Sequence, residues 1–203
     1  IGCGGSLTIL LIPLCKANSY LGLEEIYDSL KKEQSCSITL DANNAIAAKN
    51  LTAEFSPLNT QTAQLNSKAQ LNPATQTVSV EFHPPTRLFI AGAGRDAVPL
   101  ARLALELGWH VTINETRKRE QKIHRLPERV KTLGESISTL TDQSSFTQCH
   151  CLIIMHHNLE LDSQALVAAT HSEAQYIGIL GPQSRLQTLL KKTALTQAQF
   201  RGR

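Results

Sequence analysis

The sequence predicts an α/β fold, in which a Rossmann-like doubly wound parallel sheet is preceded by a smaller, incomplete α/β region. From about residue 84, apolar strand patterns alternate with amphipathic helix patterns, and this order builds parallel sheets with right-handed crossovers. Residues 92–97 read GAGRDA and connect one such strand to one such helix. We expect the doubly wound domain to occupy residues 84–203 and a linker with a connecting strand to occupy residues 41–83.

The first part of the chain contains three candidate elements. Residues 6–12, SLTILLI, are apolar and rich in β-branched side chains, so they predict a buried strand that ends before Pro13. Residues 21–33 carry apolar side chains at helical spacing, with acids early and lysines late, and predict an amphipathic helix. Residues 36–40 predict a strand. The polar composition of residues 41–75 is typical of a loop.

The second part begins with the alternating pattern of a strand at residues 77–82, which the prolines at 84 and 85 separate from the next strand. The stretch 116–132 is basic and irregular. The other elements are expected in this order: strand 87–91, helix 95–107, strand 109–113, strand 151–155, helix 160–170, strand 175–180 and helix 183–194.

Composition excludes several classes of protein. A net charge of +3 and an aromatic content of 4% do not favour nucleic acid as a partner. The longest apolar run, Leu7 to Leu14, contains a proline and is far shorter than the roughly 18 residues of a membrane span, so no membrane partner is expected. Five cysteines without framework spacing predict reduced thiols and a cytoplasmic location. The chain begins with Ile1 rather than Met, and we expect it to be a piece of a longer protein.

The motif GAGRDA has the order of residues that a phosphate cradle requires. Gly92 allows a tight turn, Gly94 lets the backbone approach a phosphate, and Ala97 lets the helix pack closely on the strand. The helix N-terminus adds free N–H groups and a positive dipole end. We include Arg95 among the candidate binding residues. The motif and its context predict a Rossmann-type fold, although a glycine turn without a ligand remains an alternative.

The second half of a nucleotide site is less regular. The acid expected about 20 residues after the glycines, where it would hold a ribose, is replaced by Asn114. Neighbouring Glu115 could substitute for it, or Arg117 and Lys118 could meet a 2′-phosphate. The basic run Arg117–Arg125 borders this position, although such runs are usually solvated faces.

His156 and His157 follow the predicted strand 151–155, at the edge where parallel sheets bind ligands. Because successive strand residues point to opposite faces, the two histidines cannot easily bind one metal ion. One of them is expected to face the crevice and to hydrogen-bond a ligand, and the alternative is an exposed or capping histidine. We predict no metal site, since Cys149 and Cys151 have no second ligand pair at zinc-finger spacing.

Gly178 and Gly181 could form a second anion-binding turn near Ser184 and Arg185, or a plain turn. Cys3 lies between glycines in GCGG. Its thiolate could act as a soft ligand or a nucleophile, whereas the alternative is a buried structural thiol.

The segment RLFIAGAGRDAVPLARLALELGWHVTINETR resembles the Rossmann domain of the XdhC/CoxI family, the accessory proteins of molybdenum hydroxylases such as xanthine dehydrogenase and carbon monoxide dehydrogenase. CLIIMHHNLELDSQAL and AQYIGILGPQSRLQTLL are similar to two later segments of that domain, and GCGGSLTILLIPL is similar to the strand that closes the family's N-terminal region. By this resemblance, residues 1–40 are the end of the N-terminal region and residues 84–203 are the Rossmann domain. Asn114 stands where many members carry Asp.

The resemblance implies an accessory chaperone that binds the molybdenum cofactor (molybdopterin), assists its sulfuration and inserts it into an apo-hydroxylase, without turning over a substrate itself. It also implies a homodimer and a cysteine desulfurase as partner. Two alternatives follow from the glycine motif alone. One is an NAD(P)-binding oxidoreductase, for which the sequence offers no convincing set of proton donors, and the other is a non-catalytic nucleotide-binding module.

Overall fold

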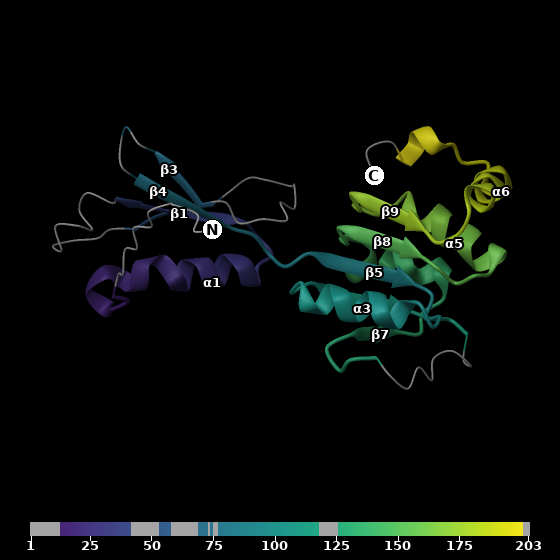
Figure 1. Cartoon of the computed structure of the whole chain (residues 1–203), viewed down its shortest axis with the longest axis horizontal. Coiled ribbons are helices and arrows are strands. Elements are labelled where there is room, and N and C mark those ends of the chain that lie inside the picture. Colours follow the sequence, from purple (N-terminus) through teal and green to yellow (C-terminus); the bar gives the residue numbers. More distant parts are fainter. Residues whose placement is uncertain are drawn as a thin grey trace, which may run out of the picture. The chain divides into compact units, whose positions relative to one another are not determined.

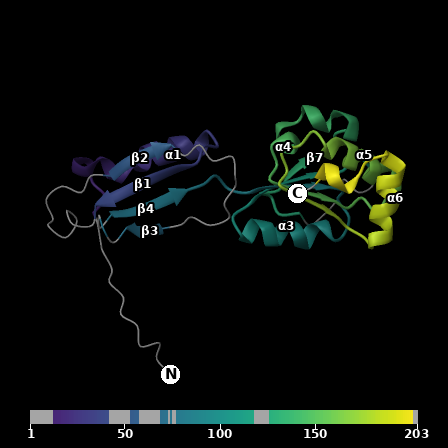
Figure 2. The same cartoon turned by 90° about the horizontal axis from the view of Figure 1, so that it is seen from above.

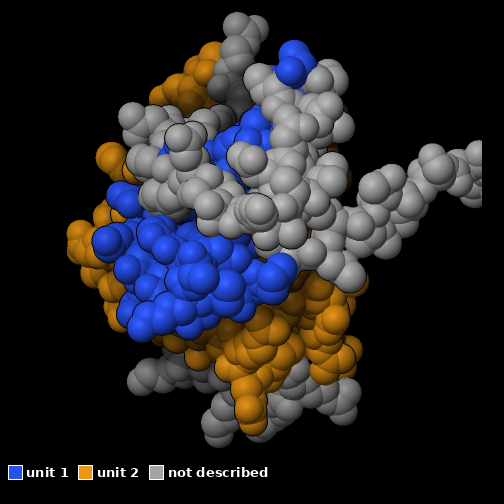
Figure 3. Space-filling view, turned by 90° about the vertical axis from the view of Figure 1, so that its left-hand side faces the viewer, with its two compact units in different colours: residues 1–84 blue, residues 85–203 orange. Residues whose placement is uncertain are grey.

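The computed structural model of the chain describes residues 13–41, 53–57, 69–72, 74, 77–117 and 126–200. The chain is divided into two compact units, Ile1–Pro84 and Pro85–Arg203, which have different colours in Figure 3. The strand predicted at residues 6–12 lies outside the described residues. No helix in the described part of the chain has the length and apolar character needed to cross a membrane.

The first unit pairs a helix with an antiparallel sheet. Its described part contains η1 (Lys16–Gly22), α1 (Leu23–Lys31), β1 (Cys36–Asp41), β2 (Ala53–Pro57), β3 (Ala69–Asn72) and β4 (Thr77–Phe82). The strands lie in the order β2-β1-β4-β3 (Figures 1 and 2). Ile26 of α1 is buried with Cys36 and Ile38 of β1, so the helix covers one face of the sheet. On a polar cross-strand pair, the hydroxyls of Thr39 and Ser79 lie 2.7 Å apart.

Residues 41–83 differ from the expected linker, because they contain β2 and β3 in addition to the expected connecting strand β4. Both extra strands lie at the edges of the sheet, where β2 pairs with β1 and β3 pairs with β4. Edge pairing is made by backbone hydrogen bonds, which polar side chains permit as well as apolar ones. The polar composition of this segment therefore concealed the two strands.

The second unit contains a parallel sheet of five strands within the described residues, in the order β7-β6-β5-β8-β9. Every neighbouring pair is parallel. The winding starts at β5, proceeds to one side through β6 and β7, and then continues on the other side through β8 and β9, which is the order of a Rossmann fold. The predicted fold class is confirmed. The strands are β5 (Arg87–Ala91), β6 (His110–Asn114), β7 (Lys131–Leu133), β8 (Cys151–Ile154) and β9 (Tyr176–Ile179).

Helices cover both faces of this sheet (Figures 1 and 2). On one face α3 (Ala97–Glu106) packs its small residues Ala97, Ala101 and Ala104 against Leu88 and Ile90 of β5. The alternate residues of β5 enter the other core, which is covered by η2 (Ile137–Asp142), α4 (Ser144–Thr147), α5 (Leu159–Ala169) and α6 (Gln183–Thr193), and Phe200 of η3 (Gln197–Phe200) packs against it. Successive residues of β5 therefore enter opposite cores, as expected for a strand that is covered on both faces.

The short elements β7, η2 and α4 are among those not expected from the sequence. They are too short to show a period, since β7 has three residues and α4 has four. Tertiary contacts decide their structure. Phe146 of α4 is fully buried and makes an edge-on ring contact with Phe89 of β5 at a centroid distance of 5.1 Å.

Candidate functional site

The sheet order brings two of the predicted groups to one edge. Strands β5 and β8 are neighbours although they are far apart in sequence, and they lie where the winding of the sheet changes side. The glycine loop, residues 92–96, follows β5, and the two histidines follow β8. In open α/β sheets, ligands bind in the crevice at the carboxyl ends of such strands.

Gly92 is required by the contact between these two segments. Its φ is +111°, and a Cβ atom at this position would lie 2.7 Å from the backbone of His156. Its N–H donates to the carbonyl of Asn114 at 2.8 Å. Gly92 therefore allows β5, β6 and the end of β8 to approach closely, in addition to allowing the turn.

Gly94 lies in a more open position. A Cβ atom there would be 3.6 Å from Cδ2 of His157, which is an ordinary contact. The backbone N–H groups of Gly94, Arg95 and Asp96 donate to no described residue. Arg95 is exposed, whereas Ala97 is fully buried under α3. The loop thus presents backbone donors at the start of α3, the arrangement that favours an anion.

Asn114 ends β6 with its side chain already engaged. It is 0% exposed, and its Nδ2 donates to the carbonyl of Glu135 at 3.1 Å. The N–H of Glu135 donates to Oδ1 of Asn114 at 3.0 Å. Asn114 therefore ties β6 to the segment after β7, and a contact between Asn114 and a ligand stays a prediction.

Glu115, the next residue, reaches back to the glycine loop. Glu115 is 2% exposed, and its carboxylate accepts a hydrogen bond from the N–H of Ala93 at 3.0 Å. It also accepts three hydrogen bonds from Arg117, one from the backbone N–H and two from the guanidinium, at 2.8–3.0 Å. Burial alone would raise the pKa of Glu115, but the hydrogen bonds from Arg117 and Ala93 outweigh it and lower the pKa below its ordinary value.

His156 belongs to a buried polar cluster beneath the crevice edge. Both its backbone N–H (3.0 Å) and its Nδ1 (3.1 Å) contact Oδ1 of Asp162 on α5, and both residues are 1% exposed. The guanidinium of Arg185 on α6 donates to Oδ2 of the same carboxylate at 2.5 Å. Burial opposes ionisation of Asp162, but the hydrogen bonds from His156 and Arg185 outweigh it and hold the pKa of Asp162 below its ordinary value.

Because an ionised carboxylate only accepts hydrogen bonds, Nδ1 of His156 carries the proton in this contact. Its other ring nitrogen, Nε2, is buried and has no hydrogen-bond partner among the described residues, and the same holds for Nε of Arg185. Asp162 was not singled out in the sequence. Its signal is a lone acid in line with Ala165, Leu166 and Ala169, at the i, i+3, i+4 and i+7 positions of the buried helix face.

His157 is exposed whereas His156 is buried, and both lie beyond the end of β8, where the alternation of a strand no longer applies. His157 has a positive φ of 56° and places Nε2 3.4 Å from Oδ2 of Asp96 in the glycine loop. The backbone of His156 packs against Gly92 while its ring is held by Asp162, and the ring of His157 is the one that lies beside Gly94 and Asp96. Neither histidine is shown to bind a ligand.

The two later glycines make room for neighbouring side chains. A Cβ atom at Gly178 would lie 2.8 Å from Cδ1 of Ile153, and one at Gly181 would lie 2.6 Å from Cδ of Arg185. The φ of Gly181 is +147°. Gly181 therefore permits the path by which Arg185 reaches Asp162, and the anion-binding role of both glycines stays a prediction.

The candidate thiols contribute no site within the described residues. Burial raises the pKa of the Cys149 thiol to about 12, which keeps it protonated. No group of three or more His, Cys, Asp or Glu side chains in the described ranges is placed to hold a metal ion. Cys3, Lys118 and most of the basic run at residues 117–125 lie outside the described residues.

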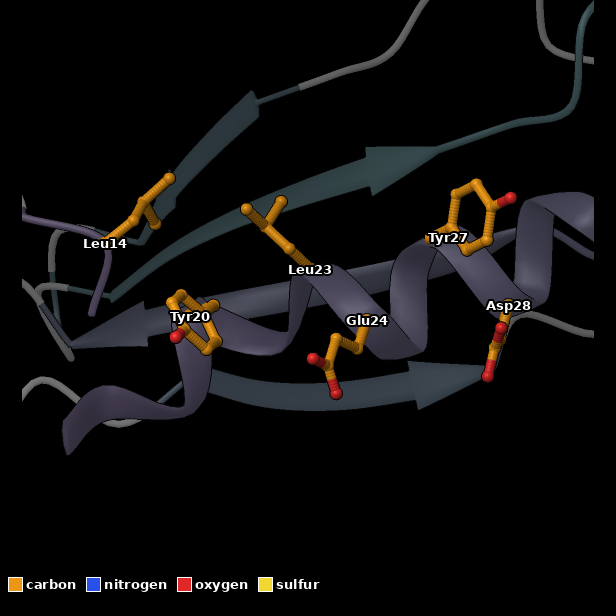
Figure 4. A pocket seen from close by; sticks show the side chains of 6 residues that line it. All are labelled: Leu14, Tyr20, Leu23, Glu24, Tyr27 and Asp28. Carbon is orange, nitrogen blue, oxygen red and sulfur yellow. The ribbon is translucent and has the colours of Figure 1, made fainter. Parts of the chain in front are cut away.

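Two surface hollows lined by described residues lie away from the glycine loop. The larger, of about 550 Å³, runs along η1 and α1 of the first unit (Figure 4) and is lined by Leu14, Tyr20, Leu23, Glu24, Tyr27 and Asp28. The smaller, of about 310 Å³, lies between η2 and α5. Neither hollow includes a residue of the glycine loop.

Comparisons with known proteins agree with the parallel sheet. A crystal structure of a xanthine dehydrogenase from Bacillus halodurans superimposes with a TM-score of 0.67 at 21% identity, over 86% of this chain and 56% of that chain. At this identity the likeness shows the fold. A protein from Bacillus subtilis (strain 168) that is named as a probable xanthine dehydrogenase subunit is 26% identical over 109 residues, which are 54% of this chain and 33% of that protein.

The chain thus spans one third of the curated relative and just over half of the solved structure. The family model described as the XdhC Rossmann domain matches residues 88–201, from β5 to the end of η3. This match covers more than half of the chain and includes the glycine loop, Glu115, the two histidines and Asp162. The chain belongs to the XdhC Rossmann domain family.

Proposed function

We propose that this protein is an accessory factor that binds the molybdenum cofactor at the glycine loop, assists its sulfuration and inserts it into a xanthine dehydrogenase-type hydroxylase. Membership of the XdhC family and the names of the two relatives support the link to xanthine dehydrogenase. The observation that carries the proposal is the glycine loop, whose N–H groups at Gly94, Arg95 and Asp96 donate to no described residue. A homodimer and a cysteine desulfurase partner are part of the same proposal.

The residues of the loop fit the cofactor through its phosphate. The cofactor is a pterin with a phosphate tail, and its molybdenum supplies the redox chemistry of the client hydroxylase. Backbone N–H groups at the start of α3 would hold the phosphate. His157 lies beside the loop, where its exposed ring can hydrogen-bond the same group. The described residues offer no cluster of metal-ligating side chains, so we assign the contacts of these residues to the phosphate and the pterin.

The first test is the pterin content of the protein. It is purified from a molybdenum-replete host and denatured, and the oxidised pterin is measured by fluorescence. We expect pterin in the unaltered protein and a loss of about tenfold or more in Gly94→Asp, because a like charge against a phosphate costs several kcal/mol. Gly94→Ala is the matched control, since its Cβ meets His157 at an ordinary distance and adds no charge.

Gly92 is unsuitable for this test. A side chain there would collide with the backbone of His156, and a loss of pterin would then report a disturbed fold. Absence of pterin from the unaltered protein, in a host whose own molybdenum hydroxylases are loaded, would contradict the proposal. Absence of pterin together with a rise in melting temperature on adding NADPH would favour the NAD(P)-binding alternative.

A further inference from the structure

The position that would read a ribose is closed by this chain's own atoms. In dinucleotide-binding Rossmann folds, an acid about 20 residues after the glycines accepts hydrogen bonds from the ribose hydroxyls. Asn114 stands at this place, and the neighbouring acid Glu115, 22 residues after Ala93 of the loop, accepts a hydrogen bond from the N–H of Ala93 and substitutes for the missing acid. We call the contacts among Ala93, Glu115 and Arg117 the clasp.

Within the clasp, the carboxylate has no acceptor position left. Oε2 of Glu115 accepts from Ala93 N–H and from a terminal guanidinium nitrogen of Arg117. Oε1 accepts from the backbone N–H and from Nε of Arg117. An ionised carboxylate offers about four acceptor positions, so ribose hydroxyls can bind Glu115 only if they displace a donor of the clasp, and three of these four donors belong to Arg117.

Displacement is unfavourable because the contact is a fork on a buried carboxylate. Nε and a terminal nitrogen of Arg117 reach the two carboxylate oxygens at 3.0 and 2.8 Å, a bidentate geometry that is stronger than a single neutral hydrogen bond. The carboxylate of Glu115 is 3% exposed, so solvent replaces a lost donor poorly. The same fork fixes the position of the Arg117 guanidinium and uses two of its five N–H donors.

We propose that Arg117 is a specificity-determining residue, which closes Glu115 to ribose and restricts the glycine loop to a compact phosphate monoester. The inference rests on the proposed function and names the form of its ligand, a pterin phosphate without an attached nucleotide. Arg117 excludes NAD and similar dinucleotides by holding the carboxylate that would bind their ribose. Removal of its guanidinium frees acceptor positions on Glu115.

The test is a calorimetric titration of protein produced in a host that makes no molybdenum cofactor. The probes are NAD⁺, its 2′-deoxyadenosine analogue, NADP⁺ and inorganic pyrophosphate. For NAD⁺ we expect a Kd at least about tenfold lower in Arg117→Ala than in the unaltered protein, because one hydrogen bond to a charged group contributes about this factor. The 2′-deoxy analogue and pyrophosphate should show no such gain.

Three further variants isolate the clasp. Glu115→Gln combined with Arg117→Ala should lose the gain, since the freed carboxylate is absent. Arg129→Ala removes one exposed arginine outside the clasp and should behave as the unaltered protein. Arg117→Lys keeps the charge without the fork, and it should show part of the increase in NAD⁺ affinity that is expected for Arg117→Ala. It also replaces Arg117→Ala as the test if circular dichroism shows that the alanine variant is unfolded.

Two outcomes would overturn the inference. One is equal NAD⁺ affinity in the unaltered protein, Arg117→Ala and Arg117→Lys. The other is tight NADP⁺ binding that Arg117→Ala abolishes, which would make Arg117 a reader of the 2′-phosphate. Both outcomes are measured on protein without pterin. If the native protein contains pterin but one of these outcomes is found, the inference fails while the proposed function stands.

Discussion

At the scale of single residues, two buried carboxylates, those of Glu115 and Asp162, lie near the crevice. Glu115 connects β6 to the glycine loop, and Asp162 connects α5 to His156 and to Arg185 on α6. In both, hydrogen bonds outweigh the unfavourable burial and lower the pKa of the carboxyl. Removing a partner from such a group leaves an uncompensated buried polar atom, so each change should affect stability as well as binding.

For Asp162→Asn we expect a loss of about 3 kcal/mol in the free energy of unfolding at pH 7, because the variant leaves Arg185 and His156 without a buried carboxylate. The folded-state pKa of Asp162 lies below the value of about 3.9 expected in the unfolded chain. Its contribution is therefore complete above that value and disappears as the pH falls through the folded-state pKa.

Urea unfolding between pH 3 and pH 7 measures this effect. The stability gap between the unaltered protein and Asp162→Asn should narrow only below about pH 4. Asp142→Asn, which changes an exposed acid, is the control and should leave stability unchanged. A gap that stays constant down to pH 3 would mean that Asp162 is not the ionised centre of this cluster.

At the scale of elements, the helices that begin at the crevice differ in how their first N–H groups are satisfied. Oδ1 of Asn158 accepts from the N–H groups of Glu160 and Leu161 at 3.0 and 3.1 Å, so α5 is capped by its own chain. Asp96, at the start of α3, makes no capping hydrogen bond. The helix of the glycine loop therefore begins without a side-chain cap, as α6 also does, and at α3 the proposed phosphate would supply the missing acceptor.

Asn158→Ala should lower stability by about 1 kcal/mol, the usual effect of removing an N-cap. Because Asp162 lies in the first turn of α5, fraying at Asn158 should also loosen its contact with His156. Thermal or urea unfolding measures the loss, and Asn158→Asp should restore most of it. Asp96→Ala is the comparison: its side chain caps nothing, so an equal loss there would contradict the assignment of the caps.

At the scale of the whole molecule, the two units bury their sheets differently. In the second unit, helices cover both faces, and residues 88–91 of β5 are all at most 3% exposed. In the first unit, α1 covers one face of the antiparallel sheet, and β4 has no fully buried residue. Backbone hydrogen bonds open most rarely where both faces of a strand are covered.

Hydrogen exchange should therefore be slowest in β5 and β8 and faster in β1 and β4. The measurement is amide exchange followed by mass spectrometry or NMR on the intact chain. We expect protection in β5 at least about tenfold above that in β4, equivalent to about 1.4 kcal/mol of local opening free energy. Equal protection in the two sheets would show that they open as one cooperative unit.

The sequence by itself determined the parallel fold and the position of the glycine loop. Strand and helix periods along residues 84–203 and the motif GAGRDA depend on neighbours in the chain, and such local patterns are visible without a structure. The same reasoning missed β2 and β3, because edge strands pair through backbone atoms that leave little trace in side-chain patterns.

Only the tertiary structure decided how the polar residues of the site are used. Asn114 and Glu115 are neighbours in sequence, yet one is bound to the segment after β7 and the other to the glycine loop. His156, Asp162 and Arg185 come from the end of β8, from α5 and from α6. Such partners meet only when the order of the strands is set, because side chains far apart in sequence are brought together by the packing of whole elements and not by any local pattern.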